Sequence, residues 1–178
     1  LSYFLLTNLL LNVLSASAPA RVVNVASSVH MKAKLDLFDV HAPRRYAGLR
    51  AYSRSKLCNV LFTYELARRL DGTGITANAL HPGLVASNIL MNNGILGRFL
   101  NMVLGVKGIS AEAGALTSVY AASSPEMEGV SGKYLDKKQV VRSSTCSYDE
   151  ADAAALWELS ASLTGIPATS PVPSLSVG

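Results

Sequence analysis

Two short apolar runs, separated by one long amphipathic segment, constrain the fold of this chain most strongly. The first run spans residues 21–26 and is rich in valine, and the second spans residues 75–80. Between them, apolar residues recur at helical spacing from about residue 50 to 71, and Gly72-Thr73-Gly74 ends the segment. Strand, helix and strand at this separation predict a parallel crossover, which brings the ends of both strands to one edge of a sheet.

The composition predicts a globular domain with a substantial core. The chain has 178 residues, of which 49% are hydrophobic and 16% are charged, and this balance argues against disorder. The net charge is +4, but the basic residues are scattered, so no nucleic acid is expected as a partner. Cys58 and Cys146 are the two cysteines, and they indicate a reducing compartment rather than a disulfide framework.

The first 14 residues are strongly apolar and admit two interpretations. Together with the small residues of Ser15–Ala18, they have the outline of a signal peptide. They lack a basic flank, however, and Asn8 and Asn12 interrupt a run that is too short to span a bilayer. We therefore expect a buried helix here.

The second half of the chain predicts three further elements and a tail. A helix is expected over 110–123, with Ser110 as its N-cap and Glu112 in its first turn. A short strand over 132–135 and a closing helix over 148–163 follow. Residues 167–178 are rich in proline and serine, so we expect the domain to span residues 1–166 and the tail to be disordered.

Tyr52 and Lys56 lie four positions apart at the head of the long helical segment. This spacing puts both side chains on one face of the helix, about one turn apart. A nearby ammonium favours the phenolate form of a tyrosine, which suits its hydroxyl to proton transfer near neutral pH. The pair alone is weak evidence for a site, because the same spacing also occurs on ordinary solvated helices.

Two further segments strengthen this interpretation because they follow the two predicted strands. Ser27 and Ser28 come directly after the first strand, and His81-Pro82-Gly83 comes directly after the second. In open α/β sheets, ligands bind beyond the carboxyl ends of the strands. Ser, Tyr and Lys in this order resemble the short-chain dehydrogenase/reductase family. The segments most similar to its retinol dehydrogenase branch are Arg21-Val22-Val23-Asn24-Val25, Ala51-Tyr52-Ser53-Arg54-Ser55-Lys56-Leu57 and His81-Pro82-Gly83.

The resemblance extends to about Ile166 and implies an α/β fold, the C-terminal part of a Rossmann-type doubly wound parallel sheet. Neither Gly-x-x-x-Gly-x-Gly nor Gly-x-Gly-x-x-Gly occurs in the chain. The first βαβ half, which binds the cofactor's pyrophosphate, is therefore expected to be missing. The asparagine of the family's proton relay would fall two positions before Leu1. By itself, the chain is expected to be poorly stable and inactive.

The resemblance implies catalytic roles for Ser27, Tyr52 and Lys56. Ser28 stays open as the alternative serine, because many family members have Ser where this chain has Ala26. The implied reaction is hydride transfer between a nicotinamide cofactor and a small lipophilic alcohol or carbonyl compound. NAD and NADP both fit this chemistry, and the resemblance favours NADP.

The resemblance also implies cofactor contacts. Tyr52 and Lys56 would lie near the nicotinamide and its ribose. Pro82, Gly83, Val85 and Ser87 would touch the nicotinamide end, because this segment resembles the family's Pro-Gly-x-Val-x-Thr. The glycine-punctuated apolar segment 88–108 would cover the substrate. No metal site is expected, and His30 and His41 are interpreted as loop residues because they lack ligand spacing.

Two other functions remain open from the sequence. The chain could be a catalytically inactive relative that serves as an interaction module, or a relative of sugar-nucleotide epimerases, which share Tyr-x-x-x-Lys. The short region after Gly83 leaves little room for a nucleotide-sugar domain, so the epimerase ranks last. An intracellular location is expected. The resemblance points to the endoplasmic reticulum or mitochondrial membrane, through an anchor that would precede Leu1, and leaves the oligomeric state open.

Overall fold

A mostly parallel sheet forms the centre of the molecule in a computed structural model that describes residues 1–37, 47–83 and 109–168. Within these residues the sheet has four strands in the order β1-β2-β3-β4. β1 pairs with β2 and β2 with β3 in parallel, whereas β4 is antiparallel to β3. The strands are β1 (Ala20–Val25), β2 (Ile75–His81), β3 (Tyr134–Asp136) and β4 (Gln139–Val141).

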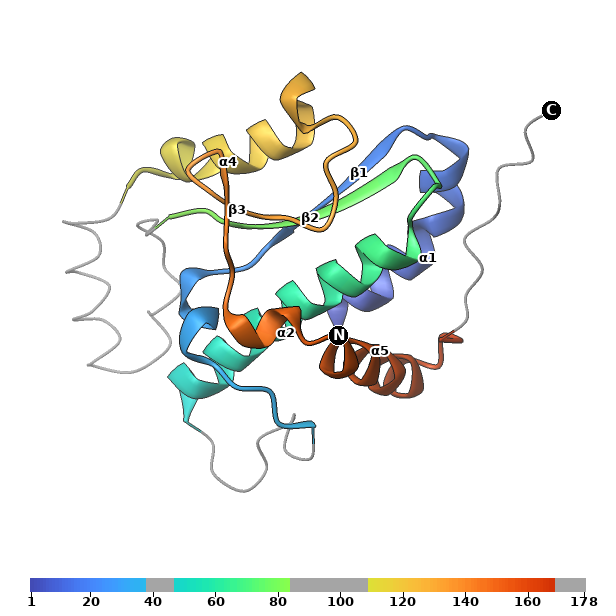
Figure 1. Ribbon diagram of the computed structural model, residues 1–178, viewed down its shortest axis with the longest axis vertical. Helices are drawn as coiled ribbons and strands as arrows, with labels where there is room; N and C mark the ends of the chain where they lie inside the picture. Colours follow the sequence, from blue (N-terminus) through green and yellow to red (C-terminus); the bar gives the residue numbers. More distant parts are fainter. Residues whose placement is uncertain (38–46, 84–108, 169–178) are drawn as a thin grey trace.

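Helices cover both faces of the sheet (Figure 1). One face carries α4 (Ala111–Ser123), and the other carries α1 (Ser2–Ala16), α2 (Gly48–Arg69) and α5 (Glu150–Thr164). Short 3-10 helices lie in the connections: η1 (Ser28–Lys32), η4 (Pro125–Met127) and η5 (Thr145–Tyr148). This layered α/β arrangement confirms the predicted fold class.

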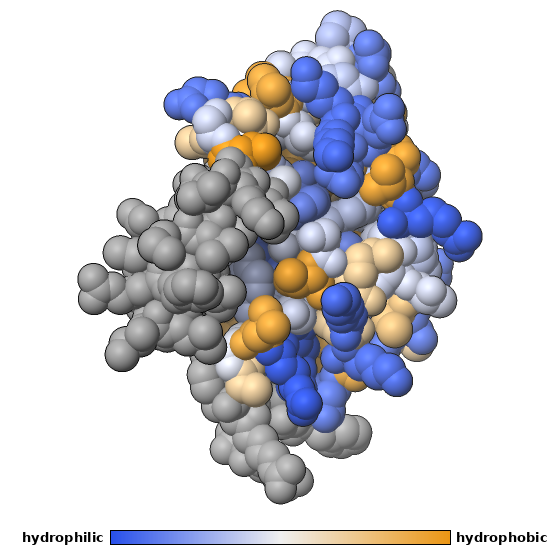
Figure 2. Space-filling model, turned by 90° about the vertical axis from the view of Figure 1, so that its left-hand side faces the viewer, coloured by the Kyte–Doolittle hydropathy of each residue, from blue (hydrophilic) through white to orange (hydrophobic). Residues whose placement is uncertain are grey.

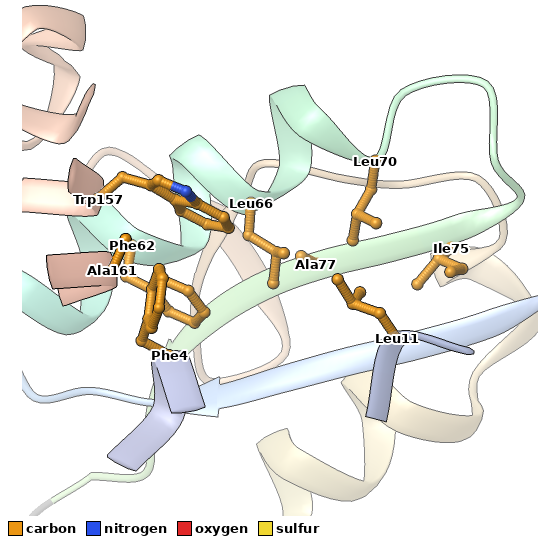
Figure 3. Packing of buried hydrophobic residues seen from close by; sticks show 9 residues of the cluster. All are labelled: Phe4, Leu11, Phe62, Leu66, Leu70, Ile75, Ala77, Trp157 and Ala161. Carbon is orange, nitrogen blue, oxygen red and sulfur yellow. The ribbon is translucent and has the colours of Figure 1, made fainter. Parts of the chain in front are cut away.

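The largest described apolar cluster fills the space between β2 and helices α1, α2 and α5 (Figure 3). The Phe62 and Trp157 rings stack with centroids 5.7 Å apart, and the Phe4 ring meets Trp157 edge-on at 4.9 Å. The cluster comprises Phe4, Leu11, Phe62, Leu66, Leu70, Ile75, Ala77, Trp157 and Ala161. Burial of these side chains fixes α2, and with it the Tyr52–Lys56 pair, against the sheet.

The predicted elements agree with the observed ones to within about two residues, because the local signals are strong. β2 is buried along nearly its whole length, as expected for a parallel strand covered on both faces. The turn between α2 and β2 uses Gly72 and Gly74 at φ +74° and +76°, a backbone region that glycine adopts without strain. Ser110 caps α4 as predicted, since its hydroxyl oxygen accepts a hydrogen bond from the amide of Ala113 at 3.2 Å.

Two features differ from the sequence predictions. Strand β4 was not predicted, and it is reached through a tight turn in which Lys137 and Lys138 have φ values of +50° and +65°. Helix α1 was expected to be buried, but only one of its faces is. Its exposed face includes Leu6, Leu9 and Val13, with exposed fractions of 59%, 66% and 61%. Packing against this sheet therefore accounts for only some of the apolar residues of the segment.

The packed part of the chain continues past Ile166. The carbonyl oxygen of Ala168 accepts hydrogen bonds from Arg69 Nη1 at 2.9 Å and from Trp157 Nε1 at 3.1 Å. Ordered contacts thus extend two residues beyond the predicted domain boundary. Residues 169–178, for which disorder is expected, lie outside the described residues. Among the described helices, none combines the length and the apolar character that a membrane span requires.

Candidate active site

The candidate site lies where β1 and β2 end. Val25 is in register with Leu80, and the amide of Ala26 donates to the Leu80 carbonyl at 2.8 Å. Ser27 and Pro82 therefore follow neighbouring parallel strands at the same edge of the sheet, which confirms their predicted convergence. Figure 2 views the molecule from this side, and the visible described surface has small hydrophobic patches between hydrophilic ones.

Lys56 points at this edge from the first half of α2. Its Nζ donates a hydrogen bond to the carbonyl oxygen of Val25, the last residue of β1, at 3.3 Å. The same Nζ lies 5.5 Å from the centre of the Tyr52 ring. Burial lowers the pKa of Lys56 from its ordinary value, because a charged ammonium is less stable away from water. The helix thus places an ammonium and a phenol together beside the end of β1.

Tyr3 joins this group from α1. Its hydroxyl donates to the same Val25 carbonyl at 3.0 Å, so a phenol and an ammonium share one acceptor. Burial raises the pKa of Tyr3, and the nearby Tyr52 raises it further. Sequence reasoning missed Tyr3, because nothing in its local pattern distinguishes it from the apolar residues around it. The contact spans 22 positions and becomes visible only when α1 packs beside β1.

The two candidate serines occupy different environments. Ser27 is buried and precedes η1, where its Oγ accepts a long hydrogen bond from the amide of Val29 at 3.5 Å. Ser28 is exposed and is the first residue of η1. Within the described residues, the Ser27 hydroxyl proton has no acceptor. Of the two serines, Ser27 is the buried one, and it lies directly beyond the end of β1.

Pro82 and Gly83 continue from β2 at the same edge. Gly83 has φ +89°, and a Cβ atom at this position would lie 2.7 Å from Cδ1 of Ile109. The backbone conformation favours a glycine here, and any larger residue would also displace the end of the Ile109 side chain. Val85, Ser87 and the expected covering segment 88–108 lie outside the described residues.

The two described histidines at this edge, His30 and His81, have buried side chains. His30 was interpreted as a loop residue, but its side chain in η1 is completely buried and bonds at both ring nitrogens. His81 at the end of β2 is also buried, and no described group bonds its Nδ1. Burial lowers the pKa of His81, partly opposed by the charge of Asp136. His41 lies outside the described residues.

A separate cavity of about 260 Å³ opens between α1, α2 and α5. Its lining includes Tyr3 and Ala51 but not Ser27, Tyr52 or Lys56. The Lys56 ammonium and the strand ends therefore define the candidate site, and this cavity does not. In the described ranges, no group of three or more His, Cys, Asp or Glu side chains is arranged to hold a metal ion.

Comparison with known proteins decides the family. A family profile described as short chain dehydrogenase matches residues 1–94, which include β1, α2 and the turn after β2. The chain belongs to the short-chain dehydrogenase family. The matched region contains each of the predicted site residues Ser27, Tyr52, Lys56, Pro82, Gly83, Val85 and Ser87.

Individual relatives place this short-chain dehydrogenase close to retinol dehydrogenases. It is 42% identical to retinol dehydrogenase 14 from Homo sapiens, covering 93% of this chain and 50% of the relative. It is 43% identical to retinol dehydrogenase 13 from Homo sapiens, covering 96% and 53%. A solved structure of an uncharacterized protein from Mycobacterium paratuberculosis superposes with a TM-score of 0.66 at 36% identity, covering 91% and 55%. The chain thus spans about half the length of the relatives that it matches.

Proposed function

We propose that this chain carries the catalytic part of an NAD(P)-dependent oxidoreductase that interconverts a lipophilic alcohol and its carbonyl compound. One observation carries the proposal: the Lys56 ammonium is 5.5 Å from the Tyr52 ring centre and bonds the last carbonyl of β1. A tyrosine hydroxyl can act as a general acid or base, and a nearby ammonium stabilises the negative charge that the oxygen carries once the proton has been given up. The carboxyl edge of a parallel sheet is also where ligands of such folds bind.

In the reducing direction, Tyr52 would donate a proton to the carbonyl oxygen of the substrate. Ser27 would donate a hydrogen bond to the same oxygen and stabilise the negative charge that develops there. Among the described residues, its buried hydroxyl donates to no acceptor. Lys56 would stabilise the phenolate form of Tyr52 that remains after the proton has been donated. In the oxidising direction the same groups would act in reverse.

The residues present suit a nicotinamide cofactor. A lysine ammonium has three donors, and in the described residues one of those of Lys56 bonds Val25, which leaves donors for ribose hydroxyls. By the resemblance, Pro82, Gly83, Val85 and Ser87 would make the contacts with the nicotinamide. When bound, the cofactor supplies or accepts the hydride. We propose NADP rather than NAD on the resemblance alone.

The substrate class follows from the relatives, whose names describe them as retinol dehydrogenases. We propose a retinoid or a similar lipophilic aldehyde, ketone or alcohol. Such compounds partition into membranes, so association with the endoplasmic reticulum or mitochondrial membrane is part of this proposal. Fractionation of cells that express the longest coding sequence containing this chain tests the location directly.

The activity test uses that longest coding sequence, purified and incubated with all-trans-retinal and NADPH or NADH. We expect retinol formation, with NADPH preferred. Ser27→Ala should lower the turnover number by about 10²-fold, as expected for the loss of a donor to a developing oxyanion. The matched control Ser28→Ala should stay within about twofold of wild type. Equal losses in both variants, or a loss confined to Ser28→Ala, would reject the role of Ser27.

A second candidate is an inactive short-chain dehydrogenase that serves as an interaction module. The exposed leucines of α1, including Leu6 and Leu9 at 59% and 66%, favour it because exposed apolar surface marks contact sites. Turnover of the nicotinamide cofactor distinguishes the two candidates. An oxidoreductase binds the cofactor and turns it over, whereas an inactive module shows no turnover with any of a panel of lipophilic aldehydes.

A further inference from the structure

His30 joins the turn after β1 to a distant turn after β4. Its Nδ1 lies 2.6 Å from the carbonyl oxygen of Ser27, and its Nε2 lies 3.2 Å from the amide nitrogen of Ser144. A carbonyl only accepts a hydrogen bond and an amide N–H only donates one. The imidazole must therefore carry its proton on Nδ1 and present a lone pair at Nε2. Both bonds exist together only in this neutral tautomer.

The far side of this link is anchored on α2. Ser143 Oγ lies 2.7 Å from the hydroxyl of Tyr64, an α2 residue, and 2.7 Å from Ser147 Oγ. The Ser147 hydroxyl in turn donates to the carbonyl of Ser144 at 2.6 Å. These buried hydroxyls hold the backbone at Ser144 relative to the helix that carries Tyr52 and Lys56. Through the imidazole, the backbone of Ser27 is tied to that same helix.

The surroundings of His30 favour the neutral ring. The Tyr134 ring of β3 lies against the imidazole with centroids 4.7 Å apart, and His81 of β2 is the titratable base that faces it. Burial lowers the pKa of His30, the bond to Ser27 raises it and His81 lowers it, with a net decrease. A protonated ring would set two donors against each other at Nε2 and the Ser144 amide.

We propose that His30 is a positioning residue, which sets the spacing between the Ser27 hydroxyl and the Tyr52 phenol by bracing the Ser27 backbone against the turn anchored on α2. The inference rests on the proposed role of Ser27. His30 does not touch the substrate in this account. It acts only through Ser27, and this restriction is what makes the inference testable.

The kinetic test is a double-mutant cycle in the longest coding sequence that contains this chain. His30→Phe keeps the ring but removes both hydrogen bonds. We expect it to lower kcat by about 10- to 100-fold, the scale of a misplacement of about 1 Å, with the KM for the cofactor within about twofold. In a Ser27→Ala background the same change should alter kcat by less than about twofold, because the group it positions is gone. Independent, multiplying losses would overturn the inference.

A matched pair at Ser144 isolates the second bond. Ser144 has φ −61° and ψ 148°, so Ser144→Pro removes the amide donor while keeping a φ that proline adopts. It should lower kcat in the same direction as His30→Phe. Ser144→Ala keeps the amide and should leave kcat within about twofold of wild type. Equal kcat values for the proline and alanine variants would contradict the inference.

A spectroscopic readout separates this inference from the proposed reaction. In histidine-labelled protein, the ¹³C and ¹⁵N shifts of the resonance that disappears in His30→Phe should report a neutral Nδ1–H tautomer at pH 7. An Nε2–H tautomer or a charged ring overturns the inference whatever the activity. If the tautomer is as expected but Ser27→Ala retains full activity, the bracing of the backbone stands. The proposed role of Ser27 then fails, and with it the catalytic purpose of His30.

Discussion

Two regions of the molecule are held together by different forces. The apolar cluster between β2 and helices α1, α2 and α5 depends on ring packing and buried area, as around Trp157. At the edge where β1 and β2 end, Tyr3 and Lys56 instead bond the Val25 carbonyl and His30 bonds the Ser27 carbonyl. Substitutions in the cluster should therefore lower the unfolding free energy. Substitutions of the polar side chains at the edge should instead lower the activity without unfolding the protein. The following predictions, made for the longest coding sequence that contains this chain, test that division.

The largest effect is expected for Tyr52→Phe. Removing the phenolic oxygen should lower kcat by about 10²- to 10⁴-fold, the usual contribution of a general acid. Tyr52 is only half-buried, so the midpoint of thermal unfolding should stay within about 2 °C. Steady-state kinetics and calorimetry of the same preparation measure both. A Tyr52→Phe variant that unfolds at a clearly lower temperature but keeps its wild-type kcat would contradict the catalytic role of this edge.

Trp157→Ala should show the opposite pattern. The ring packs against Phe4 and Phe62, and the Arg69 guanidinium lies 4.3 Å from its centre. Its loss should cost about 3–5 kcal/mol of unfolding free energy, measured by denaturant titration. Trp157→Phe is the control, since it keeps an aromatic ring but loses the Nε1 bond to Ala168 and part of the packing, for about 1–3 kcal/mol. Equal losses in the two variants would show that ring packing is not what stabilises the cluster.

Gly83→Ala tests a backbone position at the edge where β1 and β2 end. Its φ of +89° and the approach of Ile109 to 2.7 Å from a Cβ atom should together cost about 1–3 kcal/mol. Gly129→Ala serves as the control, because Gly129 has φ +68° but nothing within 4 Å of its Cβ position. The difference between the two unfolding free energies combines the contact with Ile109 and the larger φ of Gly83. A greater loss for Gly129→Ala would mean that Ile109 does not crowd this turn.

The smallest expected effect is a pH dependence of stability. Burial lowers the pKa values of His30 and His81 in the folded state, so the unfolded chain binds protons first as the pH falls below about 6.5. The contribution of the two neutral histidines to the unfolding free energy is fully present above that pH and is lost progressively below it. Asp136 faces His81 and opposes the decrease of its pKa, whereas His81 adds to the decrease of the pKa of His30.

Denaturant titrations at pH 7.5 and 5.5 should give the lower unfolding free energy at pH 5.5. His30→Phe should reduce that difference, and an unfolding free energy that rises on acidification would contradict the buried placement.

The sequence was sufficient for the parts of the fold that depend on local patterns. The valine-rich run before Ser27 and the glycines after Leu70 mark a buried strand and a helix end almost independently of context. The hairpin into β4 was missed because Lys137 and Lys138 adopt positive φ without the Gly or Asn that normally signals such a turn. The covered face of α1 could not be predicted, since a run of leucines does not specify its partner.

The candidate site shows the same division. The Tyr52–Lys56 pair is local on one helix, and its direction toward the strand end follows from which face of α2 is apolar. The contacts of Tyr3 with Val25 and of His30 with Ser144 join residues 22 and 114 positions apart. The residues next to Tyr3 and His30 in the sequence give no sign of such long-range contacts. His30 is interpreted from the sequence as a loop residue because it lacks the spacing of a metal ligand, whereas in the structure its side chain is completely buried.

The most direct test of the central claim follows the hydride itself. The protein made from the longest coding sequence is incubated with retinal and NADPH that carries deuterium at both C4 positions of the nicotinamide, and the product alcohol is examined by mass spectrometry. The account predicts one deuterium on the former carbonyl carbon, and at least about 100-fold slower labelling with Tyr52→Phe. Unlabelled alcohol, or labelling at the wild-type rate by Tyr52→Phe, would contradict it.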